Sequence, residues 1–92
     1  MLIQHAMPGT LIRIPDGVST FIGRPPFRSR RELSQGDIIG VVTEAITRNG
    51  DEIEHILPGD GHYACVLTSR MGIVWVYVPR CANFSKGILT WY

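Results

Sequence analysis

The sequence predicts a small all-β protein: one barrel of five to seven short antiparallel strands, with at most one short 3-10 turn. The chain of 92 residues has the size of one domain, so residues 1–92 are expected to form a single unit. Ten glycines and six prolines divide the chain into runs of about five to ten residues, the spacing of short strands. Apolar residues make up 45% of the chain, which is enough for a folded core.

The first half of the chain contains three strand candidates. Residues 10–14 form a short one, which the turn Pro15-Asp16-Gly17 ends, and residues 18–22 form the next. Residues 37–47 are rich in β-branched side chains but too long for one flat strand. Gly40 therefore marks a bend or a bulge within them.

The second half begins with a hairpin signal. The pair Asn49-Gly50 suits a type I′ turn, because both residues tolerate positive φ, and residues 51–57 alternate acidic and apolar side chains as a return strand would. Residues 62–69 follow as a strand. Residues 73–78 are the most apolar run in the chain and are expected to be the central strand.

Pro79 ends the central strand, because it has no backbone donor. Residues 80–84 are then expected to form a single 3-10 or helical turn. Residues 88–92 close the chain as a terminal strand.

The order of features between residues 32 and 84 resembles an SH3-like β-barrel. The stretch ELSQGDII at 32–39 is similar to the turn at which the long first loop of that family re-enters the barrel. GIVWVYVP at 72–79 is similar to the strand before the family's short final turn. The resemblance implies a small SH3-like barrel whose longest loop precedes residue 32.

The resemblance does not extend to the groove with which SH3 domains bind proline-rich peptides. The first strand candidate and the turn after it, residues 11–16, carry no aromatic side chain. Phe84 follows Pro79 by five residues, where the family has a spacing of three. A shared fold does not imply a shared ligand, so any binding surface must be sought elsewhere.

The loop GRPPFRSRRE at 23–32 is the main candidate for recognition. It holds four of the nine cationic side chains, Arg24, Arg28, Arg30 and Arg31, beside two prolines that stiffen the loop. Phe27 lies between the arginines, and an aromatic residue among arginines is typical of protein interfaces and of single-stranded nucleic-acid sites. The formal net charge is only +1, so electrostatic recognition must come from such a local patch.

Aromatic side chains supply the rest of the expected binding surface. Trp75 and Tyr77 alternate with Val74 and Val76, so one of these two faces is expected to be core. The other face is expected to contact either a partner or the terminal strand. The complete candidate binding set is Arg24, Phe27, Arg28, Arg30, Arg31, Tyr63, Tyr77 and Phe84.

No catalytic, metal or cofactor site is expected. His55, His62, Cys65 and Cys81 are residue types that bind zinc, but their spacing matches no standard ligand pattern. The chain contains neither a nucleophile elbow nor a phosphate-cradling glycine motif. It also lacks a signal-peptide pattern and an apolar run of membrane-spanning length, so a cytoplasmic protein without a membrane partner is expected.

These observations predict a non-catalytic module that binds a protein through residues 24–31 and adjacent aromatic side chains. One alternative is an RNA- or single-stranded-DNA-binding protein, in which the arginines contact phosphates and Phe27 or Tyr63 stacks on a base. Another is a small enzyme or inhibitor encoded by a phage or plasmid. The sequence leaves self-association open.

The loop hypothesis predicts the outcome of changing Arg24, Arg28, Arg30 and Arg31 together to Ser. The melting temperature should stay nearly unchanged, because loop charges contribute little to stability, while partner binding is lost. Thermal unfolding followed by circular dichroism, together with a binding assay, measures both. A large fall in melting temperature would show that the loop is structural.

Overall fold

The computed structural model describes residues 6–25, 30–51 and 61–91. In this part of the chain the structure is all-β and contains no helix. The strands, in chain order, are β1 (Leu11–Ile14), β2 (Ser19–Ile22), β3 (Arg30–Leu33), β4 (Ile38–Ile46), β5 (His62–Thr68), β6 (Gly72–Val78), β7 (Asn83–Ser85) and β8 (Ile88–Thr90). Six of them, β1, β2, β4, β5, β6 and β8, match expected strands to within one or two residues at each end.

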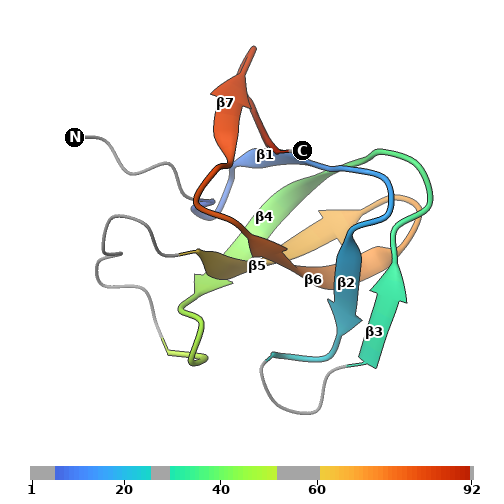
Figure 1. The fold of residues 1–92 in the computed structure, drawn as a ribbon, viewed down its shortest axis with the longest axis vertical. Coiled ribbons are helices and arrows are strands. Elements are labelled where there is room, and N and C mark those ends of the chain that lie inside the picture. Colours follow the sequence, from blue (N-terminus) through green and yellow to red (C-terminus); the bar gives the residue numbers. More distant parts are fainter. Residues whose placement is uncertain (1–5, 26–29, 52–60, 92) are drawn as a thin grey trace.

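All eight strands belong to one open sheet with the order β3-β2-β6-β5-β4-β1-β8-β7. The expectation of a closed barrel of five to seven strands is therefore wrong. The reason lies at the two ends of the sheet: the end of the first long loop forms β3 against β2, and the β7–β8 hairpin extends the sheet beyond β1. In Figure 1 the β2–β3 pair and β7 lie at opposite ends of the molecule.

The inner face of the sheet encloses the main core. Because side chains alternate along a strand, Val74, Val76 and Val78 of β6 point to the same side, and all three are fully buried. The choice left open by the sequence is thus resolved, with the valines in the core and Trp75 and Tyr77 on the opposite side. The remaining core residues are Ala6, Ile12, Ile14, Ile38, Val42, Ala64, Val66, Ala82, Leu89 and Trp91.

Hydrogen bonds from one buried serine join the turns on either side of the β2–β3 hairpin. The Ser34 hydroxyl donates to the backbone oxygen of Pro15 at 2.6 Å and accepts from the Val18 amide at 2.9 Å. Ser34 is only 2% exposed, so these bonds satisfy a hydroxyl that would otherwise be costly to bury. They hold the hairpin in place beside β1.

A second set of polar contacts ties the same region to the β5–β6 turn. The Asp16 carboxylate accepts from the Gly36 amide at 2.6 Å. Nη2 of Arg70 donates to the backbone oxygens of Gln35 at 2.8 Å and of Asp37 at 3.0 Å. Arg70 therefore closes this end of the sheet.

Two hairpin turns differ from the expectation. Gly50 has a φ of 93°, whereas Asn49 does not have positive φ, so the pair does not form a type I′ turn. The Gly50 amide instead donates to the oxygen of Thr47, and the Thr47 amide donates to the oxygen of Asp51, as in a type I turn followed by a glycine bulge. The expected return strand, residues 51–57, lies almost entirely outside the described residues.

The other difference lies near the carboxyl end of the chain. Residues 80–84 do not form a 3-10 turn: one hydrogen bond from the Ala82 amide to the Pro79 oxygen closes a tight turn, and β7 follows at once. The β7–β8 hairpin is closed by Lys86 and Gly87, both with positive φ, at 53° and 81°. The Lys-Gly pair was the local signal for this hairpin, since type I′ turns need two such residues.

Gly40 serves close packing and not a bend. It pairs regularly with Ile12 and Thr68, and the register shift falls between Val42 and Glu44, which makes Thr43 the bulged residue. A Cβ atom on Gly40 would lie 2.5 Å from Cγ1 of Val66 and 2.6 Å from the backbone oxygen of Leu67. Only glycine allows β4 to lie this close to β5.

The close approach predicts that Gly40→Ala lowers the free energy of unfolding by about 3 kcal/mol, because the methyl group overfills a packed interior. The matched control is Gly72→Ala, since a Cβ there would meet nothing within 4 Å and only the backbone φ of 70° is strained. That control should cost about 1 kcal/mol. Urea unfolding measures both, and equal losses would contradict the close-packing explanation.

Candidate functional site

The face of the sheet opposite the core, called the outer face below, carries two parallel rows of side chains. The first is the aromatic row: Arg31 of β3, Phe21 of β2, Trp75 of β6, Cys65 of β5 and Glu44 of β4, each paired in register with the next. The second is the aliphatic row: Ile73 of β6, Leu67 of β5, Val41 of β4 and Leu11 of β1, paired in the same way. Each row crosses four or five strands.

The centre of the aromatic row is buried and forms a second, small core. Trp75 and Cys65 are both 7% exposed and cluster with Ile46. Tyr63 packs beside them, with its ring centroid 6.0 Å from that of Phe21 in an edge-to-face geometry. Side chains at this end of the outer face therefore stabilise the sheet.

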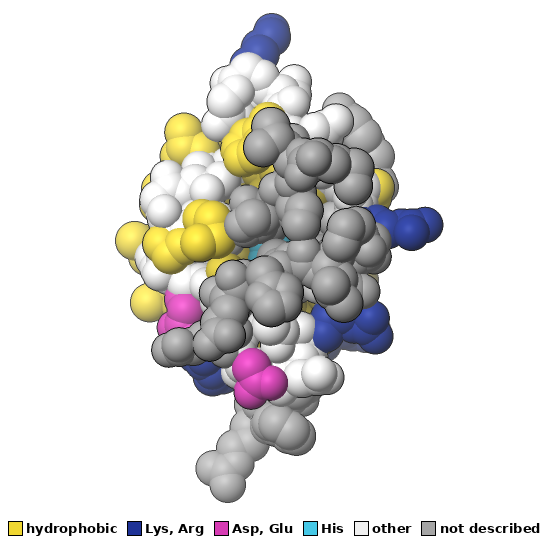
Figure 2. Space-filling view, turned by 90° about the vertical axis from the view of Figure 1, so that its left-hand side faces the viewer, with side chains coloured by type: hydrophobic (Ala, Val, Ile, Leu, Met, Phe, Trp, Pro, Cys, Tyr) yellow, Lys and Arg dark blue, Asp and Glu magenta, His cyan; other side chains and the backbone are white. Residues whose placement is uncertain are grey.

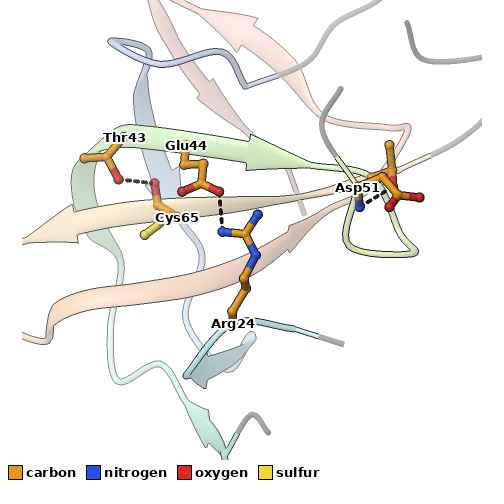
Figure 3. Close-up of polar contacts among 6 residues, drawn as sticks. Arg24, Thr43, Glu44, Asp51 and Cys65 are labelled. Carbon is orange, nitrogen blue, oxygen red and sulfur yellow. Dashed lines mark hydrogen bonds and ion pairs between the residues drawn. The ribbon is translucent and has the colours of Figure 1, made fainter. Parts of the chain in front are cut away.

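Arg24 covers the small core. Its guanidinium carbon lies 5.3 Å from the ring centroid of Trp75, a cation–π geometry, and its Nη1 forms an ion pair with Oε2 of Glu44. Figure 3 shows this side chain reaching from the segment after β2 toward β4. In the same view the bulged Thr43 donates to the Cys65 oxygen at 3.4 Å. Arg24 thus has structural contacts and is not a free recognition side chain.

The aliphatic row, in contrast, is exposed. Leu11 is 45% exposed, Val41 40%, Leu67 51% and Ile73 63%, and Ile39, two residues before Val41, is 51% exposed. In Figure 2, hydrophobic side chains gather along the left edge of the view, whereas most Lys and Arg side chains lie at the right and at the top. Five large aliphatic side chains are therefore exposed together on one face of the sheet.

The structure places the other expected arginines separately. Arg31 lies in the aromatic row, at the edge of the outer face, and is exposed. Arg30 is exposed on the opposite side of β3, where its Nη2 lies 3.3 Å from Oε1 of Glu32. Phe27 and Arg28 lie outside the described residues. The expected arginine cluster is therefore divided between both faces of one edge strand and the Arg24 contact.

The expected aromatic residues divide in the same way. Tyr63 and Tyr77 are half-buried on the outer face, with ring centroids 5.4 Å apart. Phe84 is 46% exposed on β7, at the far end of the sheet from β3, so it does not join them.

Sequence reasoning missed the aliphatic row. Its residues occupy alternate positions in apolar runs such as IIGVV at 38–42 and GIVWVYV at 72–78, which are typical of strands buried on both faces. The sequence does not show which strands pair, and the exposure of a side chain depends on its neighbours on the adjacent strands. An adjacent pair such as Leu67 and Thr68 gives no indication of which side chain is buried.

No metal-binding cluster occurs in the part of the chain that the structure describes. No three His, Cys, Asp or Glu residues there could hold an ion together. Cys65 and Cys81 are both free thiols, one buried in β5 and one exposed in the turn after β6. His62 is 2% exposed, and its Nε2 accepts a hydrogen bond from the Ala6 amide at 2.9 Å, which gives it a structural role. His55 lies outside the described residues.

Comparisons with known proteins do not assign the chain to a family. No family model, curated protein or solved structure matches the chain. The resemblance of residues 32–84 to SH3-like domains therefore stays a prediction. The described residues include no helix with the length and apolar character of a membrane span.

The two rows predict losses of stability of different size for two residues on the same strand. Trp75→Ala should lower the free energy of unfolding by about 3–5 kcal/mol, because it empties the small core. Ile73→Ala, two residues away on the same face, should cost less than about 1 kcal/mol, because the side chain is mostly exposed. Denaturant titration measures both, and a neutral Trp75→Ala would place that ring at the surface.

Proposed function

We propose that the protein is a non-catalytic binding module and that the outer face of its sheet docks a partner protein. The observation that carries this proposal is the exposed aliphatic row. With Ile39 it presents an apolar patch on the order of 400 Å², a size at which surface patches on monomers are often functional. Flat, rigid sheet faces suit such docking, because few side chains lose freedom on binding.

The charges around the patch specify the chemistry of the partner. Arg31 stands at the β3 end of the outer face, and Arg13 pairs with Ile39 beside the aliphatic row. Neither makes an ion pair within the described chain. The partner that fits is therefore an apolar surface bordered by carboxylates. Of the arginines at 24–31 that were expected to bind a partner, the proposal keeps Arg31, which would lie at the rim of the interface.

A second copy of the chain fits this surface less well. A two-fold dimer would place the same two rows against each other. Glu44 is the one carboxylate in these rows, and Arg24 already holds it. An Arg31 side chain in such a dimer would find no free acid opposite, whereas an acidic partner would supply one.

Substitutions on and off the face test the proposal. The partner is isolated from an extract of the source organism and purified, and its Kd is then measured by calorimetry. Leu67→Ser with Ile73→Ser should weaken binding at least about tenfold, since these are the two most exposed side chains of the aliphatic row. The folded state should persist, because both are at least half exposed.

The matched control is Ile22→Ser with Phe84→Ser, which changes two exposed apolar residues outside the two rows. It should leave the Kd unchanged. Equal Kd values for the two double variants would contradict docking on the outer face. Sedimentation that shows the wild-type protein forming a dimer by itself would also contradict docking of a partner protein on this face. Tight binding of single-stranded RNA or DNA that falls steeply with salt would instead support the nucleic-acid alternative.

A further inference from the structure

A pocket of 190 Å³ lies between β1 and the β7–β8 hairpin, and it borders the aliphatic row through Arg13. Its lining residues are Arg13, Ser85, Lys86, Ile88 and Thr90. Two of the five are cations, two carry hydroxyl groups, and none is acidic. This composition differs from that of the chain, in which acidic and basic residues are nearly balanced.

The strand register brings these side chains together. Ile12 of β1 pairs with Leu89 of β8, and both are fully buried on the core side. Because side chains alternate, Arg13 and the two neighbours of Leu89, Ile88 and Thr90, point to the opposite side of the sheet. Ser85 pairs with Ile88 across the hairpin and therefore lies on that side as well.

Lys86 is positioned by the hairpin turn itself. It is the one non-glycine residue with positive φ in the described chain, at 53°, and Gly87 follows at 81°. Such a two-residue turn fixes the backbone from which the lysine side chain extends. The lysine side chain thus starts from a fixed turn at the rim of the pocket that Arg13 also lines.

Thr90 provides an independent indication of a ligand. Thr90 is only 9% exposed, yet none of the side-chain hydrogen bonds of the described residues involves its hydroxyl. A buried hydroxyl without a partner costs free energy, so such groups normally have one. An oxyanion in the pocket would accept this hydrogen bond, while the two cations would balance its charge.

We propose that this pocket binds a small oxyanion, a carboxylate or a phosphate group. Arg13 and Lys86 supply the positive charge, and the hydroxyls of Ser85 and Thr90 donate hydrogen bonds to its oxygens. The planar guanidinium of Arg13 suits two oxygens of the same group. This proposal does not depend on protein docking at the aliphatic row.

Titration of the full-length, isotope-labelled protein with inorganic phosphate and, separately, with acetate tests the site by amide NMR at constant ionic strength. At least one anion should produce saturable shifts confined to residue 13 and residues 85–90, with a Kd in the millimolar range. Tighter phosphate binding identifies a phosphate site, and comparable acetate binding identifies a carboxylate site. Shifts that do not saturate, or that spread over all basic residues, overturn the proposal.

Variants separate the pocket from general surface charge. Arg13→Gln with Lys86→Gln should raise the Kd at least tenfold, whereas Arg48→Gln, an exposed arginine in the β4–β5 turn, should leave it unchanged. Thr90→Val should raise the Kd several-fold without lowering the melting temperature in the absence of anion. Equal affinity in all variants, or a clear loss of melting temperature in Thr90→Val, overturns the assignment.

Discussion

The register shared by β5 and β6 is the constraint on which the rest of the structure depends. Seven consecutive residues of β5 pair with seven of β6, from His62 opposite Val78 to Thr68 opposite Gly72. A shift of one strand by one residue would move its side chains to the opposite face of the sheet. Because the register is fixed, Val66 and Val74 meet in the core while Leu67 and Ile73 meet on the outer face. The core and the candidate interface are therefore two consequences of one pairing.

The outer face is not uniform, and the difference arises from what covers it. The Arg24 side chain covers the aromatic row, because it lies over Trp75 and forms an ion pair with Glu44. The aliphatic row has no such cover from the described chain, although its side chains are as apolar as those of the core. Arg24, expected to recognise a partner, thus contacts Trp75 and Glu44 within the sheet, while the exposed patch consists of side chains that the sequence did not single out.

Sequence patterns predicted the all-β class and the positions of six strands, because alternation and Gly or Pro punctuation are local signals. They did not predict the open sheet, since whether an edge closes depends on contacts between residues distant in the chain, such as Ile12 and Leu89. The same limit applies to the candidate sites. Arg31 was a candidate from composition, whereas Leu67 and Thr90 become candidates only through their neighbours on other strands.

The central claim is that the aliphatic row is exposed to solvent in the isolated protein and buried in the complex with its partner. Carbene footprinting with mass spectrometry measures this directly, because the reagent labels exposed side chains regardless of their chemistry. The account predicts strong labelling at Leu11, Val41, Leu67 and Ile73 in the free protein and a several-fold loss when the partner is bound, with Phe84 labelled equally in both. Weak labelling of these four side chains in the free protein, or no change in the complex, would contradict it.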